Sequence, residues 1–215
     1  MDESVRQKLD KYIADLFAPE DDLLRRVRAE SEAAGLPAIS IHADDGRMLQ
    51  FLLKSIGAQR IIELGTLGGY SGIWLARALP ADGRLFTLDM NPDHAAVATR
   101  MFEAAGLSER VEIRVGKALD SLKKLSADAP FDAIFIDADK DSYPAYLDWA
   151  IDHIRPGGLI LAHNAFFGGS IVGAEERDPR LVAGLKTFNQ RLASDPRLFG
   201  TIIPIGDGIA AAVRL

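Results

Sequence analysis

The stretch Ile134-Phe135-Ile136-Asp137-Ala138-Asp139-Lys140-Asp141-Ser142 decides the fold, because an apolar run passes directly into charged residues. The apolar half is typical of a parallel strand covered on both faces, whereas carboxylates need water, partners or metal. A second apolar run, residues 158–162, ends in His163 and Asn164. Open α/β sheets bind ligands at the carboxyl ends of their strands. The sequence therefore predicts a cleft where Asp137, His163 and Asn164 could hold a metal ion beside Lys140.

Strand and helix patterns alternate on both sides of this stretch. Strands are predicted at residues 61–64, 84–89, 111–115, 131–137 and 159–162, with helices at 71–78, 93–105, 118–125 and 143–154 between them. Such alternation is typical of a doubly wound parallel sheet. A helix at 181–193 then precedes two strands, 199–205 and 209–213, around Gly206-Asp207-Gly208. We therefore expect an α/β, Rossmann-like, mostly parallel seven-stranded sheet with an antiparallel C-terminal hairpin.

The first 58 residues are expected to form a helical cap. Residues 5–17 and 23–34 have helical apolar spacing, and an apolar stripe over 48–56 stops at Gly57. We expect this cap (1–58) and the Rossmann-like core (59–215) to form one domain, because no linker or repeat divides the 215 residues. The Gly- and Pro-containing loop 166–179 is predicted to be a lid or substrate loop.

Composition excludes several classes of protein. The net charge of -6, with acids interspersed among the bases, argues against a nucleic-acid or anionic-membrane surface. The absence of cysteine excludes disulfides and thiolate metal sites. The charged N-terminus and the lack of an apolar run near the ~20 residues of a membrane span predict a cytoplasmic protein.

The loop Glu63-Leu-Gly-Thr-Leu-Gly-Gly-Tyr-Ser71 follows the first strand and indicates a nucleotide-type cofactor at a helix N-terminus. Its glycines at 65, 68 and 69 do not match the G-x-G-x-x-G of dinucleotide sites, which disfavours an NAD-dependent oxidoreductase. Asp89 ends the second strand, where an acid can accept both ribose hydroxyls of an adenosine. The third strand ends in Gly116-Lys117-Ala118, where free backbone N–H groups could meet an adenine edge.

Together, the glycine loop, the stretch Phe135-Ile-Asp-Ala-Asp-Lys140 and the Asn164 segment resemble the cation-dependent O-methyltransferases that use S-adenosylmethionine. The resemblance is to the catechol and caffeoyl-coenzyme A group, small bacterial members in particular, and runs from Tyr12 to Gly208. It implies a small phenolic or catecholic acceptor and a homodimer. The cofactor-binding residues that it implies are Ile41, Glu63, Gly65, Thr66, Ser71, Asp89, Ala118, Asp137, Asp139 and Tyr146.

The resemblance also implies catalytic residues Lys140, Asp137 and His163, with Lys140 as the base, and a divalent metal bound by Asp137, His163 and Asn164. One residue departs from the family pattern: His163 stands where family members usually carry Asp. Imidazole favours Mn, Fe, Co, Ni or Zn over Mg or Ca.

Other roles for these residues stay open at this point. His163 could be an ordinary cleft histidine or the base of a metal-independent methyltransferase, and the protein could bind S-adenosylmethionine without catalysis. Without Asp137 nearby, Lys140 would be read as a surface lysine at the start of a helix. We expect the remaining histidines, His42, His94 and His153, to be surface or boundary residues. Trp74 is expected in the core, and Trp149 in the core or a pocket.

Overall fold

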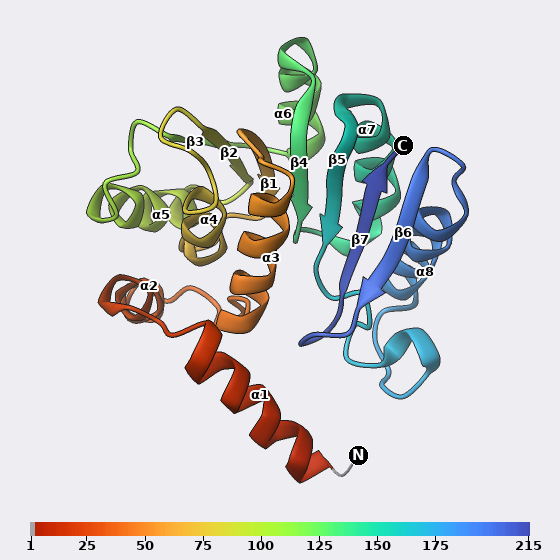
Figure 1. Ribbon diagram of the computed structural model, residues 1–215, viewed down its shortest axis with the longest axis horizontal. Helices are drawn as coiled ribbons and strands as arrows, with labels where there is room; N and C mark the ends of the chain where they lie inside the picture. The colour runs from red at the N-terminus through yellow and green to blue at the C-terminus, as the bar shows by residue number, and fades with distance from the viewer. Residues whose placement is uncertain (1–2) are drawn as a thin grey trace.

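The computed structural model, which describes residues 3–215, contains a seven-stranded sheet in the order β3-β2-β1-β4-β5-β7-β6 (Figure 1). Its first five strands pair in parallel, whereas β7 pairs antiparallel with both β5 and β6. The predicted fold class is thereby confirmed. The strands are β1 (Arg60–Leu64), β2 (Arg84–Asp89), β3 (Val111–Val115), β4 (Phe131–Ile136), β5 (Ile154–Ala162), β6 (Leu198–Ile203) and β7 (Ile209–Arg214).

Helices cover both faces of the sheet, as the continuous apolar strands predict. Successive strand residues point to opposite faces, so Ile61 packs in one core and Ile62 in the other. The first core holds α2 (Asp22–Ala33), α3 (Ala43–Ser55), α4 (Tyr70–Ala76) and α5 (Pro92–Ala104). The second core holds α6 (Ala118–Leu125), α7 (Tyr143–His153) and α8 (Pro179–Ser194).

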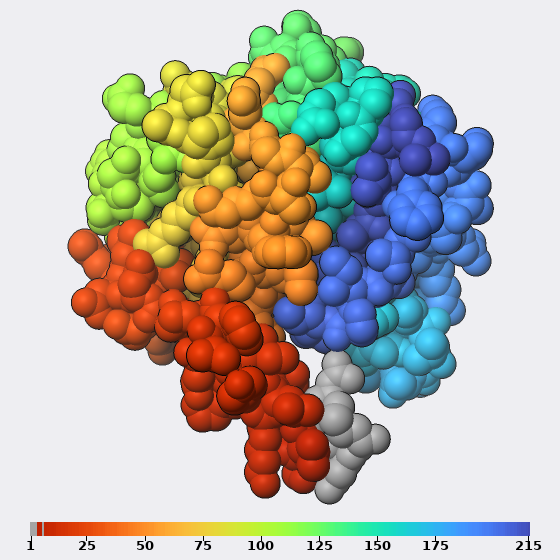
Figure 2. Space-filling model, viewed as in Figure 1, coloured from red at the N-terminus to blue at the C-terminus, as the bar shows by residue number. Residues whose placement is uncertain are grey.

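The helix α1 (Glu3–Phe17) extends away from the body of the molecule (Figures 1 and 2). The helix itself is as predicted, but its apolar residues Leu9, Tyr12 and Leu16 are exposed. Among the helices described in residues 3–215, none combines the length and the apolar character of a membrane span. The cytoplasmic location and the division into cap and core stay predictions.

Several element boundaries differ from those expected from the sequence, and a glycine explains two of the differences. The strand β5 begins at Ile154 instead of residue 159, and its register with β4 shifts between Phe131 and Ala133. A Cβ on Gly158 would lie 2.5 Å from the backbone oxygen of Asp132, so the glycine serves close approach of two strands and does not end one. The helix α4 begins at Tyr70, directly after Gly69, which has a left-handed φ of 89°.

The two tryptophans take different places. Trp74 is buried between α4 and α3, where a Cβ on Gly46 would lie 2.4 Å from its ring, so the predicted core position is confirmed. Trp149 lies on α7, stacks on His153 with ring centroids 4.3 Å apart, and donates to Ser126 Oγ at 2.9 Å. It is half-buried and takes no part in the cavity described below.

Candidate active site

The ends of the parallel strands lie side by side because their hydrogen bonding continues one residue beyond each strand. The backbone N–H of Asp137 donates to Leu64 O at 2.8 Å, and that of His163 donates to Ile136 O at 3.0 Å. The strand order reverses between β1 and β4, the position where such sheets bind their ligands. The predicted convergence of Asp137 and His163 at one edge is therefore confirmed.

A cavity of about 860 Å³ opens at this edge. Its walls come from the β1–α4 loop, the segments that follow β2 to β5, and the segment between α2 and α3. Most of the predicted site residues line it. They are Ile41, Gly65, Thr66, Ser71, Asp89, Ala118, Asp137, Asp139, Lys140, Tyr146 and Asn164.

Two predicted site residues, Glu63 and His163, do not line the cavity. Glu63 is 0% exposed and accepts hydrogen bonds from Ser71 Oγ and Thr87 Oγ1, both at 2.6 Å. Burial raises the pKa of the Glu63 carboxyl to about 7, although these hydrogen bonds favour the ionised form. Glu63 therefore reaches the cavity only through Ser71, which it orients.

The glycine loop owes its composition to packing as well as to a ligand. Gly65 has a φ of +93°, and a Cβ on it would lie 2.2 Å from the backbone oxygen of Asp137. A Cβ on Gly68 would lie 2.0 Å from Ser31 Oγ. These contacts press the loop against β4 and α2, and leave the backbone of residues 65–67 as one wall of the cavity.

Asp89 organises the cofactor side of this wall. Its Oδ2 accepts the backbone N–H groups of Thr66 at 3.0 Å and Leu67 at 2.9 Å, and its Oδ1 accepts that of Asn91 at 2.9 Å. His94 also approaches, with Nδ1 3.2 Å from Asp89 Oδ2, and lines the cavity. No part in the site was predicted for His94, which was expected to be a surface or boundary residue. The signal that could have found it is its place in the first turn of the helix that follows Asp89.

Lys140 is held by two partners. Its Nζ donates to Asp137 Oδ1 at 2.9 Å and to Tyr143 Oη at 2.6 Å. The Tyr143 hydroxyl donates in turn to Ile136 O at 3.1 Å. Tyr143 is buried and was missed from the sequence, where its only signal is a tyrosine three residues after the lysine. The pair of Asp139 and Tyr146, both predicted, joins through a 2.5 Å hydrogen bond.

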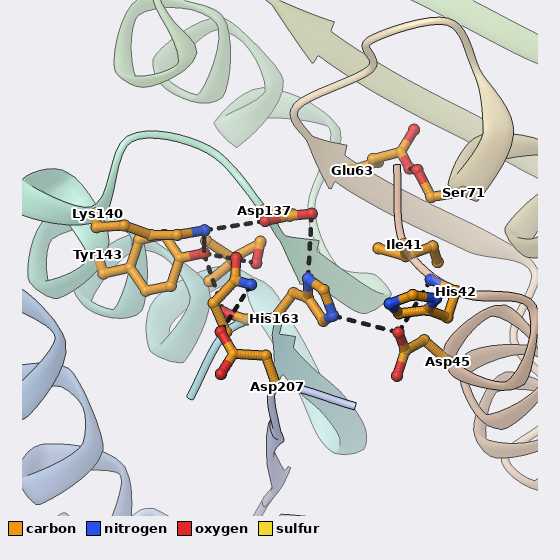
Figure 3. A network of polar contacts seen from close by, with 12 residues as sticks. Ile41, His42, Asp45, Glu63, Ser71, Asp137, Lys140, Tyr143, His163 and Asp207 are labelled. Carbon is orange, nitrogen blue, oxygen red and sulfur yellow. Dashed lines mark hydrogen bonds and ion pairs between the residues drawn. The ribbon is translucent and has the colours of Figure 1, made fainter. Parts of the chain in front are cut away.

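His163 stands between two carboxylates (Figure 3). Its Nδ1 is 3.5 Å from Asp137 Oδ2 and its Nε2 is 3.4 Å from Asp45 Oδ2. Burial lowers the pKa of His163, but the two carboxylates outweigh it and raise the pKa to about 9. The pKa of Asp137 falls to about 2, because Lys140 and His163 outweigh the opposing effect of burial. Asp45, 0% exposed, gave no signal in the sequence.

The predicted metal ligands do not fit a divalent ion in this arrangement. Asp137 is already paired with two cationic side chains, and both ring nitrogens of His163 face carboxylates. The amide nitrogen of Asn164 donates to Asp207 Oδ2 at 3.0 Å. Within residues 3–215, no three His, Asp or Glu side chains are grouped so that they could hold a metal ion. Metal binding by Asp137, His163 and Asn164 stays a prediction.

Comparison with known proteins gives the family. The sequence model of the O-methyltransferase family matches residues 14–215. The chain belongs to this family. The catechol O-methyltransferase of Niastella koreensis is 43% identical, with 99% of both chains covered. The catechol O-methyltransferase of Mycobacterium tuberculosis is 42% identical, with 95% of this chain and 94% of the relative covered.

Solved structures agree with the family assignment. The O-methyltransferase of Bacillus cereus in complex with S-adenosylhomocysteine superposes with a TM-score of 0.89 at 41% identity, and 97% of each chain is covered. An O-methyltransferase of Streptomyces achromogenes in complex with S-adenosylmethionine gives 0.90 at 36% identity, with 100% of this chain and 99% of the other covered. The protein is an S-adenosylmethionine-dependent O-methyltransferase, so the expectation of an enzyme is confirmed.

Proposed function

We propose that this methyltransferase transfers the methyl group of S-adenosylmethionine to a hydroxyl of a small catechol-like or phenolic acceptor. The observation that carries the proposal is that one cavity is lined both by the cofactor-side residues and by the pair of Asp137 and Lys140. The names of the two catechol O-methyltransferase relatives support the same acceptor class.

The cofactor is proposed to lie along the strand ends from β3 to β4. Asp89 would accept the ribose hydroxyls, and Ala118 would meet the adenine. Thr66 and Ser71 would surround the methionine part, at the N-terminal end of α4, while Ile41 covers the cavity from the cap. This placement directs the methyl group toward Lys140.

The acceptor is proposed to lie between Lys140 and the loop that follows β5. Phe167 and Arg177 of this loop line the cavity, and the Arg177 guanidinium lies 4.6 Å from the centre of the Phe167 ring. An apolar ring of this kind suits an aromatic acceptor, whose face and edge complement another aromatic side chain. Of the two roles predicted for residues 166–179, lid or substrate loop, this proposed placement favours the substrate loop.

Methyl transfer forms a carbon–oxygen bond from an electron pair of the acceptor oxygen. The carbon–sulfur bond breaks, and its electron pair neutralises the sulfonium. The hydroxyl must lose its proton, because a neutral phenol is a poor nucleophile. Two positions on Lys140 Nζ face Asp137 and Tyr143, which leaves the third for the acceptor. We assign Lys140 as the base, whose amine lone pair at this position takes the proton.

Two substitutions of Lys140 test the proposal. Lys140→Ala removes the base, whereas Lys140→Arg keeps a positive charge but cannot accept a proton at ordinary pH. We expect both variants to lose most of kcat for catechol while they bind S-adenosylhomocysteine as the parent does. Lys123→Arg, on the exposed side of α6, is the matched control. An Arg variant with parental kcat would show that charge alone suffices, and no turnover of any catechol or phenol by the parent would overturn the proposed function.

We also propose that the enzyme is a homodimer, as the family resemblance implies. The exposed apolar residues of α1, which extends from the body, offer a surface for a second copy (Figure 2). Light scattering should give twice the chain mass for the parent and the single-chain mass for Leu9→Asp. A parent of single-chain mass would contradict the proposal.

A further inference from the structure

His163 fills the space between the N-terminal cap and the active-site edge of the sheet. Its ring stands between Asp45, in the first turn of α3, and Asp137, directly after β4 (Figure 3). The neighbouring Asn164 lines the cavity, but His163 does not. The residue that replaces a carboxylate of the family pattern therefore does not face the cavity.

Both ring nitrogens of His163 face carboxylate oxygens, at 3.4 Å and 3.5 Å. Both separations are ion-pair distances, and Nε2 is buried without a hydrogen-bond partner. A carboxylate only accepts hydrogen bonds, and an imidazole presents an N–H on both nitrogens only when it is the imidazolium. A metal ligand or a general base needs a ring nitrogen with a free lone pair. This geometry favours neither of the two roles, ligand or base, that the sequence left open for His163.

The charges of the cluster balance without an ion. Asp45 is fully buried, and His163 is the cationic side chain within ion-pair distance of it in the part of the chain that the structure describes. Asp137 pairs with Lys140 as well as with His163. While Lys140 still carries its proton, before it acts as the base, two carboxylates thus meet two cations. A hard divalent ion needs an excess of negative oxygen ligands to replace its water, and the cluster offers none.

We propose that the imidazolium of His163 is a built-in cation that replaces the divalent ion implied by the resemblance, and that it holds the cap onto the active-site edge. The connection to the cavity runs through Asp45, whose Oδ2 also accepts the backbone N–H of His42 at 3.1 Å. The residue before His42, Ile41, lines the cavity. His163 is therefore a positioning residue for the wall that covers the cofactor, and the enzyme needs no divalent ion to form this wall.

Metal titration of chelator-treated protein tests the inference without any acceptor. The parent, His163→Asp and the matched control His153→Asp, on α7, are titrated with Mn²⁺ followed by electron paramagnetic resonance. The His163→Asp exchange turns a balanced cluster into one with excess carboxylates, so we expect it to bind Mn²⁺ at least about tenfold more tightly than the parent. The control should bind as the parent does. Parent protein that binds Mn²⁺ as tightly as His163→Asp would overturn the inference.

Cofactor binding gives a second measurement that does not depend on the folding of His163→Asp. The affinity of the chelator-treated parent for S-adenosylhomocysteine should not change when Mn²⁺ is added, whereas Asp45→Asn should bind S-adenosylhomocysteine severalfold more weakly than the parent. The inference would be contradicted if Mn²⁺ changed the affinity of the parent for S-adenosylhomocysteine, or if folded Asp45→Asn bound S-adenosylhomocysteine as tightly as the parent does. The inference rests on the proposed function only for the cofactor position, and a failure to methylate catechols would leave these binding results unaffected.

Discussion

Replacement of Asp89 by alanine tests how the structure holds its cofactor. The carboxylate accepts three backbone N–H groups, of Thr66, Leu67 and Asn91, at 2.9 to 3.0 Å. Thr66 is buried, so its N–H loses a partner that water does not replace, at a cost of about 1–3 kcal/mol in the free energy of unfolding. The ribose hydroxyls lose a charged acceptor as well, worth about 1.5–3 kcal/mol, or roughly 10- to 150-fold in the Kd for S-adenosylhomocysteine.

Isothermal titration calorimetry with S-adenosylhomocysteine measures the Kd, and urea unfolding measures the stability. Asp93→Ala is the matched control, because Asp93 is an exposed acid in the first turn of α5, four residues after Asp89. Asp89→Asn keeps one acceptor oxygen, so its Kd should fall between those of Asp89→Ala and the parent. A folded Asp89→Ala protein with the parental Kd would refute the placement of the ribose at the end of β2.

Two further substitutions probe the cofactor loop. Glu63 has a pKa raised from 4.5 to about 7, so its contribution to stability is fully present below pH 4.5 and is lost as the pH rises through 7. As the pH rises from 4.5 to 7, the free energy of unfolding of Glu63→Gln should therefore increase relative to that of the parent, by about 3 kcal/mol at most. If urea unfolding shows the same pH dependence for both proteins, the raised pKa of the Glu63 carboxyl is refuted. Gly65→Ala places a side chain at a residue with positive φ and brings its Cβ to 2.2 Å from the Asp137 backbone oxygen. Gly35 also has a positive φ, but a Cβ there would have no atom within 4 Å, so Gly35→Ala is the control. Differential scanning calorimetry should show that Gly65→Ala is less stable than Gly35→Ala by about 1–3 kcal/mol, the cost of overpacking. Equal losses of stability in the two variants would show that the loop moves to accommodate the new Cβ.

The sheet could be predicted because its signal is local. Apolar residues that face both cores, such as Ile61 and Ile62, mark a strand buried on two sides, and a charged residue such as Asp137 marks its end. The position of the cavity then follows from the general rule for open sheets. The start of β5 was missed, because Gly157 and Gly158 suggest a turn in sequence, whereas Gly158 serves the close approach of two strands in space.

The surroundings of His163 could not be predicted, because its second partner lies far away in sequence. Asp45 belongs to the first turn of α3, where acids are common for reasons of the helix dipole alone. Only the packing of the cap on the sheet brings its carboxylate to the histidine. The exposure of the apolar face of α1 could likewise not be predicted. Apolar periodicity indicates an amphipathic helix, but it does not indicate what packs against the apolar face.

The central claim is that this chain methylates an oxygen of a catechol-like acceptor with S-adenosylmethionine. The most direct measurement incubates chelator-treated enzyme with catechol and S-adenosylmethionine that carries a deuterated methyl group, and analyses the product by mass spectrometry and NMR. We predict a catechol monomethyl ether that carries the intact labelled methyl group on oxygen, with S-adenosylhomocysteine formed in equal amount. Cofactor consumption without a labelled ether, or a label on carbon, would contradict the claim.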